Sequence, residues 1–390
     1  MSYRGEHGFP HLSIEAMERD LSDVEYGVST VLASPYKKRQ PQHDRLVQEH
    51  GGLSPYKPEE LAADRRTIID LGRRDQTEDT VRGRILEAFL AEHASTLGWF
   101  GPESHAVTTC EYDNRRNATD IVLTLPGKDG QPAYLAIDVT TATSGGALSE
   151  KQHRLKQSLE TGELTSLKYY FDASEPVIGV RRLEHIPRVV IGLPADAVGE
   201  LCKLLEPYLK SGQRHTGEAS LREHPLKDEL ISSTVSQLEQ QILFLVVHYF
   251  ELISKRDPHG SCVYITKTRL PEQFEQFSKL IHSLTETMLA PDPSRVTERL
   301  PLLTQSVEVL ESLGKHFQVD FPLGQCVRKI SEIRDLLASS RSNKKGSEKR
   351  SSDPGTEVVH LSDREWTRAD DHGFTPWFRR AAELVELEQR

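Results

Sequence analysis

The chain has 390 residues, and 49 Lys and Arg against 59 Asp and Glu give it a formal net charge of −10 at pH 7. With 36% hydrophobic and 28% charged residues it has the composition of a soluble protein, and its most apolar run, residues 242–250, is far shorter than the roughly 20 residues that cross a bilayer. The acidic balance disfavours a protein that coats nucleic acid generically, although a local basic groove stays compatible with it.

The cysteines and the first residues indicate a compartment. Cys110, Cys202, Cys262 and Cys326 lie far apart in the sequence and form no C-x-x-C pair. The opening stretch, MSYRGEHGFPHL, contains no apolar segment of the kind that a secretory signal needs. We therefore expect a reduced, cytoplasmic protein with no structural disulfide and no membrane contact.

The first 195 residues divide into two parts. Residues 1–74 show no sustained hydrophobic period, which predicts an N-terminal arm that is partly helical or flexible. In residues 75–195 helical and strand patterns alternate, beginning with an amphipathic helix that starts after Thr77 and runs to Phe89. Strands are expected at 106–112, 119–125, 133–140 and 188–193, with turn residues 113–117 joining the first two into a hairpin and a leucine-faced helix at 148–159. The predicted order is helix, strand, strand, strand, helix, strand, an α/β fold.

The remaining sequence is mostly helical. Residues 196–338 predict helices at 197–208, 227–253, 271–289, 294–313 and 324–337, with one short strand at 262–266. Residues 339–356 are rich in Ser, Lys and Gly and predict a flexible linker. Residues 357–390 form a short amphipathic tail with several aromatic side chains, which either cap the C-terminal region or dock onto a protein partner.

Two carboxylates stand out in the predicted strands. Because side chains alternate along a strand, Asp120 and Asp138 each point away from the apolar face of their own strand. A charge in a buried strand is costly unless it is paired, hydrogen-bonded or bound to a metal. If the strands are neighbours, the two carboxylates converge, and a divalent cation such as Mg²⁺ relieves their repulsion.

The first predicted helix offers a third acid. On a helical wheel Glu78 falls inside the apolar stripe and is expected to face inward, whereas Glu87 falls on the opposite side and is expected to face water. The alternative for Glu78 is that it only interacts with the N-terminal dipole of its helix.

The element order and the three acids resemble the PD-(D/E)xK nuclease-like superfamily, also called restriction-endonuclease-like. The resemblance rests on Glu78, on Asp120 within ATDIV and on Asp138 within IDVTT, and covers about residues 75–195. It implies an αβββαβ core, followed here by a mainly α-helical C-terminal region, and metal-dependent hydrolysis of phosphodiester bonds. By the same resemblance Asp120, Asp138 and the main-chain carbonyl of Val139 would ligate Mg²⁺ or Mn²⁺, with Glu78 as a further ligand or as the group that positions a metal-bound water.

The sequence departs from that family at one important position. The family has a lysine two residues after the strand acid, where this chain has Thr140, which can hydrogen-bond a water but carries no positive charge. One explanation places the lysine on the next helix, where Lys151 is preferred over Lys156 because it lies nearer the helix N-terminus, with Gln152 on the inward face. The other explanation is a catalytically inactive module that binds nucleic acid or protein.

Other motifs give weaker indications. The chain has no phosphate-cradling nucleotide loop, no G-x-S-x-G and no H-E-x-x-H. His248 is expected to be a hydrogen-bonded core histidine, and Arg115 and Arg116 either hold backbone phosphates or form a solvated turn. The sequence thus predicts a Mg²⁺-dependent nuclease, and we expect its substrate to be DNA. The sequence does not decide whether the protein forms a homo-oligomer.

Overall fold

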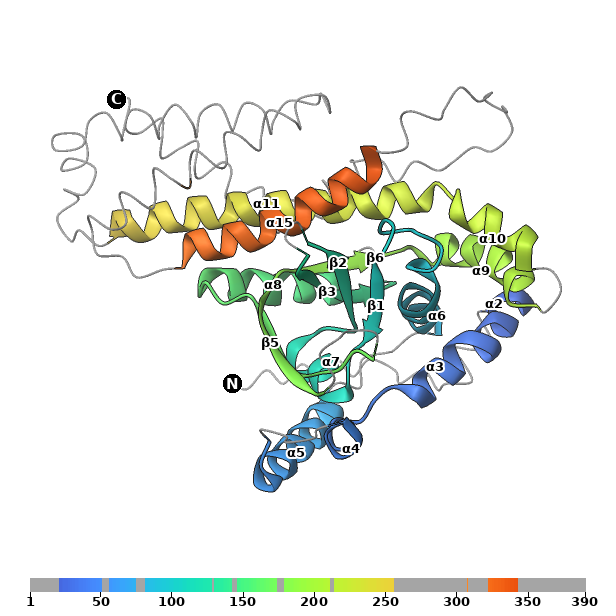
Figure 1. Ribbon diagram of the computed structural model, residues 1–390, viewed down its shortest axis with the longest axis horizontal. Helices are drawn as coiled ribbons and strands as arrows, with labels where there is room; N and C mark the ends of the chain where they lie inside the picture. Colours follow the sequence, from blue (N-terminus) through green and yellow to red (C-terminus); the bar gives the residue numbers. More distant parts are fainter. Residues whose placement is uncertain are drawn as a thin grey trace, which may run out of the picture.

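A computed structural model describes residues 21–50, 56–74, 81–127, 130–141, 146–173, 179–210, 214–255, 307 and 322–342. Glu78, the predicted strand 262–266, the helices 271–289 and 294–313 apart from Val307, most of the linker and the whole tail lie outside the described residues. The described part is a mixed α/β fold, mostly helical, arranged around a small mixed sheet (Figure 1).

The sheet has four strands in the order β1-β2-β3-β6. Strands β1 (His105–Thr108), β2 (Ile121–Pro126) and β3 (Pro132–Thr140) form an antiparallel meander, and β6 (Arg188–Gly192) pairs parallel to β3. A separate antiparallel pair, β4 (Thr165–Tyr170) and β5 (Arg181–Ile186), lies between β3 and β6 in the chain. The element order that the sequence predicts is present as α6 (Val81–Phe89), β1, β2, β3, α8 (Gly146–Glu160) and β6, with further elements inserted.

The remaining helices come before and after this set. On the N-terminal side are α2 (Asp23–Val28), the π-helical turn η1 (Ser29–Ala33), α3 (Ser34–Arg39), α4 (His43–His50) and α5 (Pro58–Arg74); η2 (Leu90–Ala94) continues α6. On the C-terminal side are α9 (Ala195–Leu209), α10 (Arg214–Arg222), α11 (Leu226–Lys255) and α15 (Leu323–Ser342). In Figure 1 the long helices α11 and α15 lie side by side along the sheet. No helix of the described ranges is long and apolar enough to cross a membrane.

The two faces of the sheet pack against different partners. Ile121 and Leu123 of β2, with Leu135 and Ile137 of β3, belong to the main core together with residues of the surrounding helices. The alternate residues Val122 and Ala136 pack instead against side chains of β4 and β5. This division follows the period-two alternation that the sequence predicts for these strands. The main core also includes residues from Val28 in α2 to Leu337 in α15, so helices from both ends of the described chain cover the same sheet.

The outer edge of β6 is sealed by side chains of α11. The amide of Gln237 accepts a hydrogen bond from Val190 N at 3.0 Å and donates one to Val190 O at 2.8 Å. One helical turn further on, Gln241 Nε2 donates to Arg188 O at 2.8 Å. These amides satisfy backbone groups that an unpaired edge strand would expose.

One predicted element is wrong. The first strand ends at Thr108, and the expected hairpin turn is the helix α7 (Glu111–Asn117), which connects β1 to β2. Arg115 bonds Glu111 and Asn117 bonds Asp113, both at the i,i+4 spacing of a helix. The buried Asp113 also accepts from the main-chain N–H groups of Lys168 and Tyr169 in β4, which fixes α7 against that strand.

Candidate active site

Asp120 closes the end of the sheet where β2 begins and β3 ends. Its main-chain N–H donates to Ile137 O at 2.9 Å, and its carboxylate Oδ2 accepts from Val139 N at 2.6 Å. The carboxylate therefore takes the place of a backbone acceptor where the two strands separate. Because Asp120 is bonded to the residue that follows Asp138, the two predicted acids are brought to the same end of the sheet.

The second oxygen of Asp120 is held by α7. Asn114 Nδ2 donates to Asp120 Oδ1 at 2.6 Å. A carboxylate oxygen can accept more than one hydrogen bond, so both oxygens keep acceptor capacity after these contacts. Asn114 carries no signal in the sequence, because its role depends on a helix where the pattern of turn residues predicts a loop.

Lys151 of α8 reaches the end of β3. Its Nζ donates to Asp138 Oδ1 and, at 2.8 Å, to the carbonyl oxygen of Val139. The side chain of Asp138 is 6% exposed and that of Lys151 is 19% exposed, so the ion pair is largely removed from water. The structure therefore places one cation on the carboxylate and carbonyl that the family resemblance assigns to a metal.

Glu87, which the sequence places on the solvent side of its helix, is buried, and that prediction is wrong. Glu87 is 6% exposed, and every residue from Ile85 to Phe89 is buried. The reason is that the N-terminal segment covers the face of α6 that the helical wheel leaves to water: Tyr36 of α3 donates its hydroxyl to Glu87 Oε1 at 2.8 Å.

The acids influence one another. Burial, followed by the negative charges of Glu87 and then Asp138, raises the pKa of Asp120 well above its ordinary value, while Lys151 and the hydrogen bond from Val139 N act in the opposite direction. Burial and then Glu87 likewise raise the pKa of Tyr36, which keeps its hydroxyl protonated and able to donate. Asp120 is thus repelled by two other carboxylates, Glu87 and Asp138.

A second cation stands beside Asp138. Arg188, at the start of β6, is 7% exposed, and its Nη1 donates to Asn117 O at 2.9 Å. Burial lowers the pKa of its guanidinium, and the charge of Asp138 opposes that shift. Asp138 therefore has two cations near it, Lys151 and Arg188.

The donor set is compatible with a small hard cation. Among the described residues, no three His, Cys, Asp or Glu side chains are arranged to enclose one ion. Mg²⁺, however, is commonly held by one or two carboxylates and several waters. Asp138 Oδ1 and Val139 O already share one cation, Lys151 Nζ, and the carboxylate of Asp120 bonds the main chain of the same residue. These oxygen donors are of the kind that Mg²⁺ or Mn²⁺ prefers.

The remaining residues that the sequence singles out lie on β3, α8 and α11. Thr140 is buried at the end of β3, and Gln152 is half-buried beside Lys151 on α8. Lys156 forms an ion pair with Glu160 at 3.8 Å, one turn along its own helix. His248 makes a ring-nitrogen contact with Glu160 O at 3.0 Å, as expected for a core histidine.

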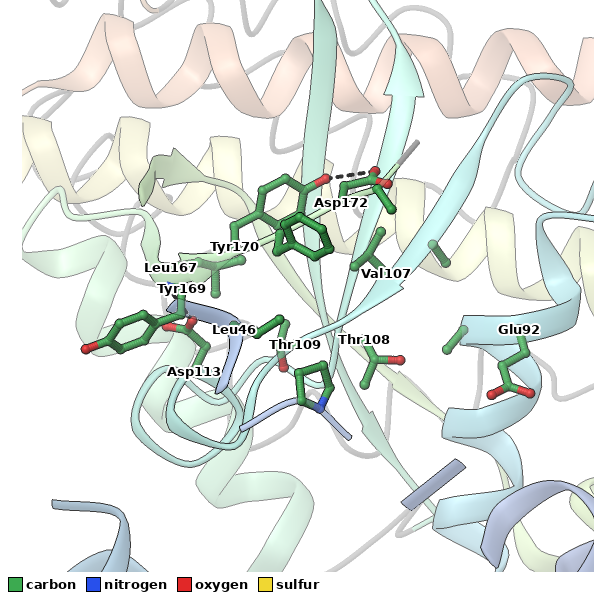
Figure 2. Close-up of a pocket in the computed structure, with 15 residues that line it drawn as sticks. Leu46, Glu92, Val107, Thr108, Thr109, Asp113, Leu167, Tyr169, Tyr170 and Asp172 are labelled. Atoms are coloured by element: carbon green, nitrogen blue, oxygen red, sulfur yellow. Dashed lines mark hydrogen bonds between the residues drawn. The ribbon is translucent and has the colours of Figure 1, made fainter. Parts of the chain in front are cut away.

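A cavity of about 350 Å³ lies between β1 and β4. Figure 2 shows Val107, Thr108 and Thr109 on one side of the cavity, with Tyr170 at the end of β4 and Asp172 just after that strand. None of the predicted site residues that the structure describes lines it. The cavity and the carboxylates are nevertheless adjacent, because Thr109 N donates to Asp120 O at 3.0 Å.

Comparisons of the chain with protein-family models, with curated proteins and with solved structures find no match.

Proposed function

We propose that this protein is a divalent-metal-dependent nuclease with a divergent restriction-endonuclease-like core, and that it hydrolyses phosphodiester bonds in DNA. The observation that carries the proposal is the contact of Lys151 Nζ with both Asp138 and the carbonyl of Val139, next to Asp120. A lysine from α8 thereby stands at the strand end where Thr140 supplies no charge.

The chain's own groups would divide the work as follows. Asp120, Asp138 and the carbonyl of Val139 would hold Mg²⁺ or Mn²⁺, which supplies a water of lowered pKa and offsets charge on the scissile phosphate. The ammonium of Lys151 would orient the attacking water and stabilise negative charge on the phosphate. Asn114 keeps the carboxylate of Asp120 in one orientation, so that its position does not have to be set during the reaction.

The direct test is cleavage of plasmid, linear and single-stranded DNA, and of RNA, in Mg²⁺ or Mn²⁺. We expect Asp120→Ala and Asp138→Ala to lose at least about 100-fold in kcat, because each removes a carboxylate that positions the metal. Cleavage that survives both substitutions would place the reaction elsewhere. RNA cleavage without DNA cleavage would correct the substrate.

Lys151 has a matched control on the same helix. We expect Lys151→Met to lower kcat by about 100-fold, within the range for removal of one charged group that acts in the transition state. Lys156→Met should keep wild-type cleavage, because Lys156 forms an ion pair with Glu160 one turn further along the same helix. The reverse pattern would assign the catalytic cation to Lys156.

The second candidate is a catalytically inactive module of the same fold that binds nucleic acid or a protein. Thr140 at the family's lysine position favours it. The two candidates separate in one experiment: DNA bound at physiological salt with no product in Mg²⁺ or Mn²⁺, and with affinity unchanged in Asp138→Ala, would identify the inactive module.

A further inference from the structure

The cavity between β1 and β4 is linked to the carboxylate site by hydrogen bonds. Thr109 lines the cavity, and its main-chain N donates to Asp120 O at 3.0 Å. Asp113 lines it from α7, and the next residue of that helix, Asn114, donates to the carboxylate of Asp120 at 2.6 Å. A molecule in the cavity would therefore lie beside the residue that the proposed function assigns to the metal.

The charges around the cavity are of one sign. Its charged lining residues within the described part of the chain are Glu92, Asp113 and Asp172, and no Lys or Arg belongs to that lining. Like charges repel, so the phosphates of a nucleic-acid backbone do not suit this space. The group that suits it is neutral or cationic and donates hydrogen bonds.

Aromatic side chains give the cavity flat walls. Three consecutive residues, Tyr169, Tyr170 and Phe171, belong to its lining (Figure 2). The ring of Phe171 stacks on that of His50, with centroids 4.0 Å apart and 11° between the planes. Nucleobases stack on aromatic side chains of any sequence context. A volume of about 350 Å³ is at the lower end of the range for small-molecule sites and fits one planar ring system.

A buried carboxylate provides direction within this space. Asp172 is 7% exposed, and its Oδ2 accepts from the hydroxyl of Tyr170 at 3.2 Å and contacts Nε2 of His105. The same hydroxyl lies 3.3 Å from Thr124 Oγ1 on β2, so the network is anchored in the sheet. An ionised carboxylate only accepts hydrogen bonds and has capacity for about four, so Asp172 can accept from a ligand while it keeps both contacts.

We propose that this cavity is a pocket for one unstacked nucleobase of the DNA substrate, and that Asp172 selects a base whose edge donates hydrogen bonds. Guanine suits it best, because N1–H and the N2 amino group lie side by side. Thymine suits it least, because its single N–H lies between two carbonyl oxygens that a carboxylate repels. The inference rests on the proposed function for its place in cleavage, whereas the binding of a free nucleoside is measurable without it.

The test is saturation-transfer NMR of deoxyguanosine and of thymidine with the full chain, without metal. Nucleosides carry no phosphate, so contacts of the nucleic-acid backbone do not contribute. We expect deoxyguanosine to bind about 10-fold more tightly than thymidine, within the range for one well-placed base contact. No binding of either nucleoside, or equal binding of both, would overturn the inference.

Two matched substitutions locate the binding. Ala173 lines the cavity and is exposed, so Ala173→Trp should fill its edge and abolish the deoxyguanosine signal. Ala219 is exposed on α10 and does not line the cavity, so Ala219→Trp should bind as the wild type does. Wild-type binding by Ala173→Trp would place the nucleoside elsewhere and overturn the inference.

Asp172→Asn tests the selection itself. An amide presents one acceptor and one donor group in place of two acceptors, so the preference for deoxyguanosine over thymidine should fall to about 2-fold or less. An unchanged preference would show that Asp172 does not select the base. Should Asp172→Asn fold poorly because His105 loses its charged partner, Ala173→Trp still decides whether the cavity is the pocket.

Failure of the pocket and failure of the nuclease give different results. A chain that binds deoxyguanosine in the cavity but cleaves no DNA would refute the proposed function and keep the pocket. A chain that cleaves DNA equally well whichever base stands at each position of an oligonucleotide, and that binds no nucleoside, would keep the nuclease and refute the pocket.

Discussion

Asp120 combines a structural and a chemical task in one side chain. Its carboxylate replaces a backbone acceptor for Val139 N, and it also lies within the repulsive influence of Glu87 and Asp138. The structural bond fixes where the carboxylate stands, and burial together with that repulsion makes its ionised form costly unless a cation is near. A position that is well ordered but electrostatically unfavourable is typical of functional sites.

The raised pKa of Asp120 predicts how the stability of the fold depends on pH. Because the pKa of Asp120 is raised in the folded chain, the folded state binds more protons than the unfolded state between the ordinary value of 3.8 and the raised value. The free energy of unfolding should therefore fall as pH rises through that window, and Asp120→Asn should remove this part of the decrease. Urea denaturation of both proteins at a series of pH values measures it.

The pH dependence of the wild type must be compared with that of Asp120→Asn, because other groups in the chain also titrate. The pKa of the buried Asp113 is raised as well, chiefly by burial, and that of Glu25 is lowered against its own burial by Arg82 and Ser22. Both contributions are the same in the two proteins and cancel. Identical slopes for wild type and Asp120→Asn would show that Asp120 is not the group responsible.

Among the elements, β3 and α8 follow directly from the sequence, and α7 does not. Period-two alternation predicts the faces of β3, and a leucine stripe predicts α8, on which Lys151 meets Asp138. The helix α7 consists of polar residues that favour turns, and it is stabilised by contacts of Asp113 with β4, some 55 residues away in the chain. A tertiary contact of that separation leaves no local pattern.

The burial of Glu87 could not be predicted for a related reason. A helical wheel assumes one buried face, whereas α6 lies between the sheet core and the N-terminal segment. Nothing near Glu87 in sequence indicates that Tyr36, 51 residues earlier, covers it. The family resemblance directed attention to Glu78 instead, whose role stays a prediction.

The edge of β6 gives a prediction at the scale of one element. Gln237→Leu would leave the N–H and carbonyl of Val190 without their partners on α11. We expect a loss of about 2 kcal/mol or more in the free energy of unfolding, since each buried backbone group left unpaired costs about 1–3 kcal/mol. Gln157→Leu, on the exposed face of α8, should change stability by less than about 0.5 kcal/mol. Equal effects of the two substitutions in urea denaturation would contradict a role for Gln237 in sealing the edge.

At the scale of the whole molecule, the first and last described helices complete the core around the sheet. The helical region that follows β6 is joined to it by α11, and α11 is joined to α15 by one buried ion pair. In that pair Arg334 bonds Glu239 Oε1 at 2.7 Å and 3.0 Å, with the two side chains 11% and 8% exposed. Burial acts to lower the pKa of Arg334, but hydrogen bonds and charge from Glu239 and Asp335 outweigh it and raise that pKa, so the guanidinium stays protonated at any ordinary pH.

This pair allows the contribution of α15 to be measured without shortening the chain. Arg334→Met should lower the free energy of unfolding by about 3–5 kcal/mol, because it leaves the carboxylate of Glu239 buried without its counter-charge. Arg334→Met combined with Glu239→Leu should recover most of that loss, since replacing both partners by apolar side chains removes the uncompensated charge. Urea denaturation followed by the buried Trp99 and by far-ultraviolet circular dichroism should give one coincident transition if α15 unfolds together with the sheet. Two separate transitions would show that α11 and α15 form a unit independent of the sheet, and the active site would then retain DNA cleavage after the helical pair has melted.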